Sequence, residues 1–381
     1  MTHLDVTTDG LEAHARLLLL LGRPTVPAAD LEEARRLVDG GAVDWGAFVE
    51  ASARHKLLPL VARNLVDGRL DRGDRGDGSN GIPFAWLYPY AYLANRSRNQ
   101  TTSDEVRRVV SELSRAGVRH AVRKGFVLAE EFYSDTGARR INDLNLLVAR
   151  SDAPRVHDVL TSLGYAQGRI ARDADVVEPF SRATQVFWRT NLGNQLPYVR
   201  LGGQMDVPVH NVDLCHEIFQ PNLGIACATE DLLDRARPVR LCGTDTWRLG
   251  DVDLLLDLCA HLHKEATGLL FVEGGTDLQV SKFLDLAVVG AATDAPTWDA
   301  FVARVTELGA DEVVFYALWF TARLYPAAVP GHVLGSLRPA DTSYLDVVGD
   351  RDGHPTTWSV PFPERLFSGP RVAAPSLVPH R

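Results

Sequence analysis

The chain has 381 residues, 45% of them hydrophobic, and a formal net charge of −9 at pH 7. This length is enough to bury one large core or two moderate ones, and it predicts roughly two or three domains. The acidic balance argues against a broad surface for nucleic acid or anionic membranes, although a local basic pocket can still hold a phosphate group. We therefore expect neither bulk nucleic acid nor a membrane as a partner, and the composition leaves the oligomeric state open.

The cysteines and apolar segments give no sign of secretion. The four cysteines lack both Cys-x-x-Cys spacing and the density of a disulfide scaffold, which predicts reduced thiols. The apolar run at 17–21 is too short to cross a bilayer, and no cationic segment with a cleavage site surrounds it. A cytoplasmic protein is the expectation.

Residues 1–99 are expected to form an N-terminal helical region. Apolar residues recur at three- and four-residue spacing from 11 to 66, which predicts helices. Residues 67–83 are rich in glycine and charge, with almost no apolar side chains, so they are predicted to be a flexible loop. A long amphipathic helix is predicted from 86 to 116.

The character of the sequence changes at residue 117, and residues 100–225 are predicted to form an α/β core. Strand-like and helix-like segments alternate there, a pattern typical of α/β architecture. The predicted strands are 117–122, 144–148, 184–190 and 198–209, and the predicted helices are 126–133 and 153–163.

Helical patterns dominate again from 226 to 330, which predicts a C-terminal helical domain. The predicted helices there are 231–237, 252–266, 278–289 and 296–325. Residues 331–381 are rich in Pro, Gly and Ser and are predicted to be an irregular tail. The chain as a whole is expected to be α+β, with a mixed sheet at its centre and helices on both sides in sequence.

Lysine is rare in this chain. Of forty basic residues only four are lysines, namely Lys56, Lys124, Lys264 and Lys282. Such wide use of arginine is typical of a GC-rich, actinobacterial-type genome. A retained lysine then indicates a position where a compact ammonium is preferred to a planar guanidinium. Chance survival of the four lysines is the alternative explanation.

Residues that can carry chemistry concentrate around the second predicted strand. Lys124 and Gly125 end the first strand, and Asp143 and Asn145 lie at the start of the next. Side chains two positions apart point to the same side of a strand, so Asp143 and Asn145 are expected to face one pocket. Two oxygen ligands there can hold a divalent ion that a third carboxylate completes.

Asp206 is the predicted third carboxylate, because it lies in a segment expected to join the same sheet, and Asp213 is the reserve. The pattern of His210, Asp213 and His216 would form a separate metal site if this segment were helical. A polar loop that leaves the sheet is the alternative.

Several short motifs follow one another at defined spacing along the chain. The first are Gly22-Arg23-Pro24, Asp44-Trp45 and Ala53-Arg54-His55-Lys56-Leu57-Leu58-Pro59-Leu60. The central ones are Arg123-Lys124-Gly125 and Arg139-Arg140-Ile141-Asn142-Asp143-Leu144-Asn145-Leu146-Leu147-Val148, and later ones lie at 254–262 and 282–287. The order and approximate spacing of these motifs resemble the uncharacterised nucleotidyltransferases related to the DNA polymerase β superfamily, and the likeness covers roughly residues 11–290.

This resemblance implies a nucleotidyltransferase-type core that moves a nucleoside monophosphate from a Mg²⁺-bound nucleoside triphosphate to a small molecule or peptide. Two ions then polarise the α-phosphate and activate the acceptor. The resemblance implies that Gly125 approaches the phosphates and that Lys124 or Arg139 pairs with them. It also implies that Asp143 binds metal, and that Asp206 binds metal or helps to deprotonate the acceptor.

Asn145 departs from the family pattern, which has a second Asp at this position. An amide offers a carbonyl oxygen but no negative charge, so metal affinity is expected to fall, to one ion or none. Three hypotheses remain open. The protein is a weakened but active nucleotidyltransferase, a fold reused for another reaction in specialised metabolism, or a binding protein that has lost catalysis.

Three residues of the predicted C-terminal helices are further candidates for phosphate contact. His261 and Lys264 would reach the phosphates from the helical domain, and the alternative is a hydrogen-bonded core histidine beside a solvated lysine. For His263 the core position is preferred. Lys282 would contact a phosphate or form an ordinary surface ion pair with Asp285.

Overall fold

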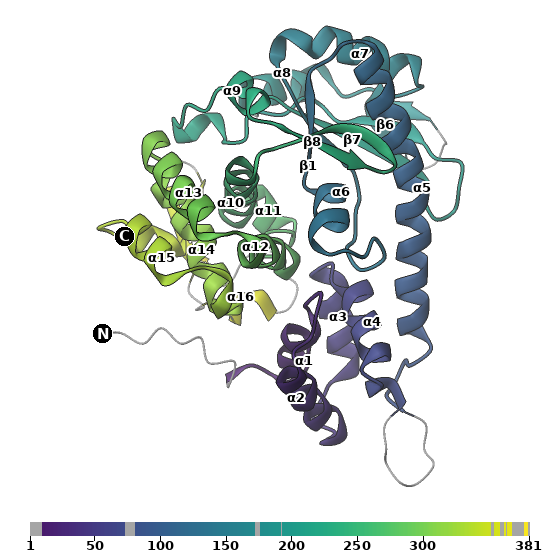
Figure 1. Ribbon diagram of the computed structural model, residues 1–381, viewed down its shortest axis with the longest axis vertical. Coiled ribbons are helices and arrows are strands. Elements are labelled where there is room, and N and C mark those ends of the chain that lie inside the picture. Colours follow the sequence, from purple (N-terminus) through teal and green to yellow (C-terminus); the bar gives the residue numbers. More distant parts are fainter. Residues whose placement is uncertain are drawn as a thin grey trace.

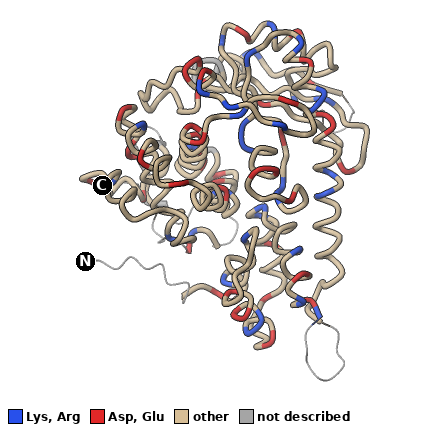
Figure 2. Tube along the Cα trace, viewed as in Figure 1, with Lys and Arg blue, Asp and Glu red and all other residues tan. Residues whose placement is uncertain are grey.

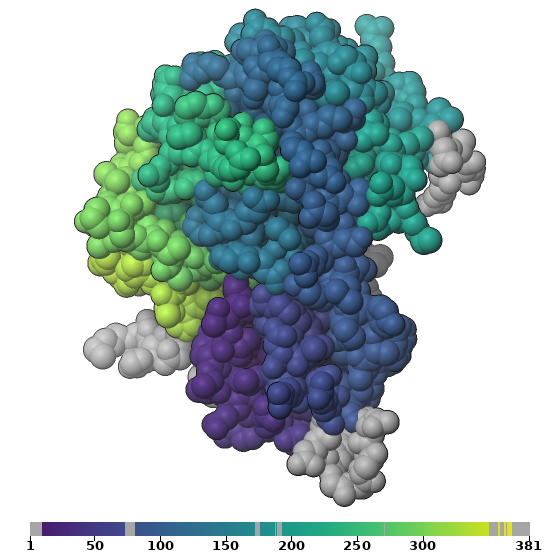
Figure 3. All heavy atoms as spheres, turned by 45° about the vertical axis from the view of Figure 1, so that its right-hand side comes forward, coloured from purple at the N-terminus to yellow at the C-terminus, as the bar shows by residue number. Residues whose placement is uncertain are grey.

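The computed structural model describes residues 10–72, 81–171, 176–191, 193–351, 354–358, 362, 364–367 and 377–379. Figure 1 shows N-terminal helices at the lower end, a sheet with its covering helices at the upper end, and C-terminal helices to the left. Helix α5 (Leu87–Arg115) runs from the N-terminal helices to the sheet, as the space-filling view also shows (Figure 3). Basic and acidic residues are both scattered over the trace (Figure 2).

The N-terminal region is helical. Its helices are α1 (Ala13–Leu21), α2 (Ala28–Asp39), α3 (Trp45–Arg54) and α4 (Leu58–Asp67). Asp44 caps α3, because its carboxylate accepts a hydrogen bond of 2.9 Å from the backbone N–H of Ala47. Of the predicted loop at 67–83, residues Leu70–Arg72 form a 3₁₀ turn, and residues 73–80 lie outside the described part of the chain.

A mixed sheet forms the centre of the molecule, and its strand order is β3-β6-β7-β2-β1-β9-β8 in the described chain. These strands are β1 (His120–Arg123), β2 (Leu144–Val148), β3 (Ala166–Gln167), β6 (Tyr198–Leu201), β7 (Val209–Cys215), β8 (Arg237–Leu241) and β9 (Thr244–Arg248). Strand β2 runs parallel to β7 and antiparallel to β1. The short strands β4 (Arg169–Ile170) and β5 (Val177–Glu178) pair separately. The α+β class and the mixed sheet are thereby confirmed.

Helices follow the strands and cover the sheet. Those within and after the core are α6 (Gly125–Val127), α7 (Ala153–Ser162), α8 (Arg182–Asn191), α9 (Thr229–Asp234), α10 (Asp251–Thr267), α11 (Leu269–Glu273), α12 (Val280–Ala292), α13 (Ala295–Leu308) and α14 (Asp311–Leu324). A π-helical turn, Leu128–Phe132, directly follows α6. In the described part of the chain, no helix is both long enough and apolar enough to span a bilayer.

The alternation of side chains along β2 assigns the two faces of the sheet. Leu144 and Leu146 belong to the core formed with α5 and α7. Leu147 belongs to the other core, which includes the leucines of α10. Asn145 therefore lies on the α10 face, because strand side chains alternate between faces. The sheet thus presents its polar positions toward the C-terminal helices.

Two strand predictions in the core are wrong. Residues 184–190 lie in helix α8, since so short an apolar pattern fits a strand and a helix equally well. The predicted strand 198–209 is two strands, β6 and β7, with a chain reversal between them. Gly202 permits this reversal, because a Cβ there would lie 1.8 Å from the carbonyl oxygen of Val207.

Strands β8 and β9 extend the sheet beyond the predicted core boundary at residue 225, where only helices were expected. They form a hairpin around Cys242 and Gly243, with φ of 51° and 75° respectively. Positive φ at both central residues is the geometry of a type I′ turn. The sequence did not indicate this hairpin because Cys-Gly is not one of the common type I′ pairs. The predicted helix 231–237 is the shorter α9.

The C-terminal helices pack around α10. The stretch predicted to be helical at 296–325 consists of α13 and α14, because Gly309 takes a φ of 62° and ends α13. Residues 331–381 were expected to be irregular, and the structure corrects this. They contain α15 (Gly331–Leu337), α16 (Glu364–Phe367), β10 (Val347–Arg351), β11 (His354–Trp358) and β12 (Leu377–Pro379). Burial of apolar side chains explains why regular structure forms here, since Val333 and Leu366 are fully buried.

Candidate functional site

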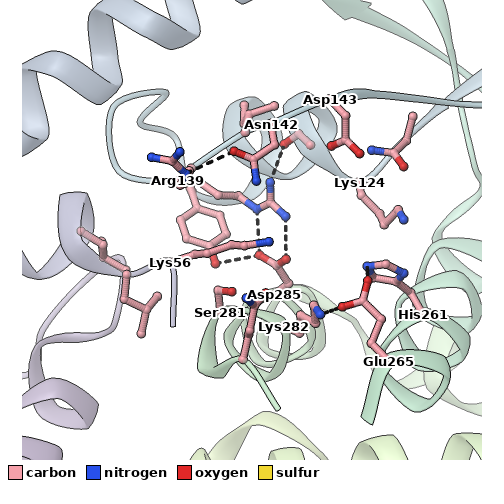
Figure 4. A pocket seen from close by; sticks show the side chains of 18 of the residues that line it. Lys56, Lys124, Arg139, Asn142, Asp143, His261, Glu265, Ser281, Lys282 and Asp285 are labelled. Carbon is pink, nitrogen blue, oxygen red and sulfur yellow. Dashed lines mark hydrogen bonds and ion pairs between the residues drawn. The ribbon is translucent and has the colours of Figure 1, made fainter. Parts of the chain in front are cut away.

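A cavity of about 230 Å³ lies between the sheet, the loop after α3, and helices α10 and α12. Polar and charged side chains point into it from each of these elements (Figure 4). It gathers eight of the nine predicted site residues. They are Lys124, Gly125, Arg139, Asp143, Asn145, His261, Lys264 and Lys282.

The sheet side of the cavity carries two carboxylates and one amide. Asn145 on β2 is the register partner of Asp213 on the parallel strand β7, and Asp143 immediately precedes β2. The three side chains therefore share one face of the sheet. Neither the Asp143 carboxylate nor the Asn145 amide has a hydrogen-bond partner in the described chain, so both are free to bind a ligand.

Neighbouring residues orient the Asp213 side chain and change its pKa. The Asn194 side chain donates a hydrogen bond of 2.9 Å to Oδ2 of Asp213. Burial raises the pKa of Asp213, and the nearby Asp143 carboxylate raises it further. The raised pKa favours a carboxylate that can exchange a proton as well as bind a cation.

Asp206, the predicted third carboxylate, does not line the cavity, and this placement corrects the prediction. Its Oδ2 accepts hydrogen bonds from the hydroxyls of Ser97, at 3.1 Å, and Thr101, at 3.3 Å, on α5. The reversal after Gly202 carries Asp206 toward α5 and lets β7 bring Asp213 to the cavity instead. The reserve candidate thus occupies the position that was expected for Asp206.

Lys124 follows directly after β1 and has a φ of 50°, an uncommon conformation for a residue with a Cβ. Its side chain is buried, and burial together with the charge of Arg123 lowers the pKa of Lys124 to about 8. The next residue, Gly125, opens α6 and lines the cavity with its backbone. Such strain at a lysine beside a cavity is typical of a functional position.

All four lysines of the chain line this one cavity. Lys56 also has a positive φ, of 59°, and burial lowers its pKa. Lys56 is not among the predicted site residues, although the rarity of lysine in the chain is a signal that points to it. Concentration of every ammonium group at one place argues against chance survival.

Arg139 forms part of the wall. Its Nε and Nη2 donate to the two carboxylate oxygens of Asp285 at 2.9 and 2.7 Å (Figure 4). The hydroxyl of Tyr133 donates to Asp285 at 2.8 Å, and Nη1 of Arg139 lies 3.4 Å from the Gly125 carbonyl oxygen. The guanidinium is thus largely occupied by protein partners, which leaves the lysines as the freer cations.

His261, Glu265 and Lys282 form a chain on the helix side. Nε2 of His261 lies 3.3 Å from Oε1 of Glu265, and Glu265 makes an ion pair with Lys282 (Figure 4). Burial and the charge of Lys124 lower the pKa of His261 well below its usual value, so the imidazole is neutral near pH 7. The expected surface pair of Lys282 with Asp285 is replaced by separate pairs with Glu265 and Arg139.

Two histidine hypotheses are settled by packing. His263 packs edge-on against Tyr316, and burial lowers its pKa to about 4, as suits a core residue. His210 and His216 alternate with Asp213 along β7 rather than sharing a helical face. Nδ1 of His216 lies 2.9 Å from the carbonyl oxygen of Val148.

The donor set can be tested against the expected divalent ion. Asp143, directly before β2, and Asp213, on the parallel strand β7, supply two carboxylates, and Asn145 on β2 adds an amide oxygen. Oxygen ligands of this kind suit Mg²⁺, which commonly binds one or two carboxylates and completes its shell with water and phosphate. No group of three or more His, Cys, Asp or Glu residues suited to a metal occurs in the described chain. These donors fit one ion better than two.

Comparison with known proteins assigns the fold to a family. A family model described as an uncharacterised nucleotidyltransferase matches residues 41–326. No curated protein matches the chain. The matched segment covers the sheet, the cavity and the helices that close it, and it confirms the resemblance of the sequence motifs. The chain belongs to this uncharacterised nucleotidyltransferase family.

Proposed function

We propose that the chain binds a nucleoside triphosphate in this cavity and transfers its nucleoside monophosphate to a small-molecule or peptide acceptor. One observation carries the proposal. Every lysine of the chain lies around the same cavity as Asp143 and Asp213, which stand on or beside neighbouring parallel strands. Ammonium groups suit the phosphates, and the two carboxylates suit a divalent ion that bridges to them.

In the proposed reaction, a hydroxyl or amino group of the acceptor attacks the α-phosphorus. The bond from the α-phosphorus to the oxygen shared with the β-phosphate breaks, and pyrophosphate leaves with the electron pair. Asp213 takes the role expected for Asp206, as a metal ligand or as the group that receives the acceptor proton. Bound Mg²⁺ would neutralise charge that develops on the phosphates.

Asn145 favours a second candidate. The amide removes one negative charge from the position where the family has an Asp, and this weakens any site for a second ion. A protein that binds a nucleotide or a related phosphate without nucleotidyl transfer is therefore the alternative, with a repurposed role in specialised metabolism. The variant Asn145→Asp separates the two candidates. Metal-dependent turnover that appears only in this variant supports the alternative, and turnover that is lost in it supports the transferase.

Calorimetric titration with each of ATP, GTP, CTP and UTP, with and without Mg²⁺, tests the proposal. We expect at least one nucleotide to bind, and Mg²⁺ to strengthen that binding. In Asp143→Ala the strengthening by Mg²⁺ should disappear, because one of two metal carboxylates is gone. Asp206→Ala is the matched control and should behave like the natural protein. Failure of all four nucleotides to bind would refute the proposal.

A further inference from the structure

The cavity carries more positive than negative charge. Six cationic side chains line it in the described chain, namely Lys56, Lys124, Arg139, Arg140, Lys264 and Lys282. Four carboxylates face them, namely Asp143, Asp213, Glu265 and Asp285. With the neutral His261, the excess is two positive charges before any ligand enters.

The pairing of these charges shows where the excess lies. Arg139 is neutralised by Asp285, and Lys282 is neutralised by Glu265. The other four cations, Lys56, Lys124, Arg140 and Lys264, make no ion pair within the described residues, and of these Arg140 is exposed. Lys124 and Lys264 line the cavity together with Asp143 and Asp213. Their charge is therefore directed at the place where a metal would bind.

Lys124 and Lys264 reach this place from two different elements. Lys124 comes from the end of β1, and Figure 4 shows its side chain between Asp143 and His261. Lys264 comes from α10, with Nζ 6.0 Å from the centre of the Phe271 ring. Arg123, the residue before Lys124, is paired with Asp257. Because this buried carboxylate already has a cationic partner, it does not fully neutralise Lys124.

The charge of a triphosphate limits the number of cations that fit with it. A triphosphate carries about four negative charges near neutral pH, since its terminal phosphoryl group carries about two. Against the excess of two positive charges in the cavity, one divalent ion completes neutrality. A second divalent ion would leave two uncompensated positive charges in a largely buried site, which is costly.

We propose that Lys124 and Lys264 supply the positive charge that a second divalent ion would bring, so that the cavity binds a triphosphate with at most one such ion. This inference rests on the proposed nucleotide binding and deepens it. It predicts that the triphosphate group binds measurably with no divalent ion at all.

Inorganic triphosphate is the probe, because it tests the phosphate site without the base. Calorimetry in EDTA should show binding to the natural protein. Lys124→Met and Lys264→Met should each weaken this binding about tenfold or more, since each removes a charge-assisted hydrogen bond. Arg119→Met is the control, because Arg119 is exposed and pairs with Asp234 outside the cavity.

Native mass spectrometry then counts Mn²⁺ ions on the complex with inorganic triphosphate. We expect no more than one ion on the natural protein and two on Asn145→Asp, whose added carboxylate restores charge for a second ion. Two ions on the natural protein would overturn the inference. So would unchanged metal-free affinity in a folded Lys124→Met or Lys264→Met variant.

Different results would refute the proposed nucleotide binding and the proposed role of the two lysines. Binding of triphosphate that strictly requires Mn²⁺ would refute the role of the lysines but leave the proposed function intact. Absence of binding under every condition would refute both. Circular dichroism of each variant establishes folding, and Lys264→Met carries the test if Lys124→Met does not fold, because Lys264 is only half-buried.

Discussion

Asn145 is the residue that separates this chain from the pattern its family resemblance implies. Its place on the cavity face was predictable, because the two-residue spacing from Asp143 fixes the side of a strand to which it points. The structure adds that its register partner is Asp213. An amide between two carboxylates lowers the negative charge of the donor set without removing an oxygen ligand.

Three other residues show the limits of what sequence spacing can predict. Asp206 and Asp213 are both carboxylates near one strand, and only the reversal at Gly202 decides which of them reaches the cavity. Lys56 lies just after α3, far in sequence from the predicted site residues, and reaches the cavity through the packing of the N-terminal helices. Local periodicity in the sequence indicates neither which carboxylate reaches the cavity nor that Lys56 lies beside it.

The lowered pKa of Lys124 makes triphosphate binding depend on pH. The group is cationic below its pKa of about 8 and loses its proton as the pH rises through that value. Binding of inorganic triphosphate in EDTA should therefore weaken above about pH 8, well before an ordinary lysine would titrate. Calorimetry over a pH series measures this change.

Lys124→Met supplies the control for this pH dependence. Its weaker binding should show no step near pH 8, because the titrating ammonium is absent. A step of equal size in the variant would assign the pH dependence to another group.

At the scale of elements, the reversal between β6 and β7 positions the site. It allows β7 to lie beside β2, so that Asp213 stands opposite Asn145. The sequence indicated a turn at Gly202 and Gly203. It did not indicate that one strand ends there and another begins, since the alternation of apolar residues continues on both sides. Interstrand pairing, which is non-local, determined where each strand ends.

Gly202→Ala tests this reversal. The new Cβ would overlap the Val207 carbonyl oxygen, so the turn must shift, and we expect a loss of about 1–3 kcal/mol in the free energy of unfolding. Urea denaturation measures it. Gly331→Ala is the control, because nothing lies within 4 Å of a Cβ there, and its stability should stay equal or rise by up to about 1 kcal/mol. Equal stabilities for the natural protein and Gly202→Ala would contradict this account.

At the scale of the whole molecule, a buried ion pair joins the sheet to the C-terminal helices. Nε of Arg123, on β1, donates to Oδ2 of Asp257, on α10, at 3.1 Å, and both side chains are almost fully buried. This contact links β1, which directly precedes Lys124, to α10, which carries His261 and Lys264.

Breaking this pair on one side should be far more damaging than replacing both partners. Asp257→Ala leaves a buried guanidinium uncompensated, and we expect it to lower the free energy of unfolding by about 3–5 kcal/mol. The double variant Arg123→Met, Asp257→Leu replaces the pair with apolar groups of similar size and should lose much less. Urea denaturation of both proteins measures the difference, and equal losses would show that the charges themselves are not the cause.

The sequence by itself determined the α+β class, the family, the helical regions on both sides of the core, and the strand that carries Asn145 and directly follows Asp143. These follow from local periodicity and from motifs whose residues are close in the chain. Only the tertiary structure decided the hairpin β8–β9, the order in the C-terminal stretch, the choice of Asp213 over Asp206, and the meeting of four distant lysines. Each of these depends on pairing and burial between segments far apart in sequence, for which no local pattern carries the information.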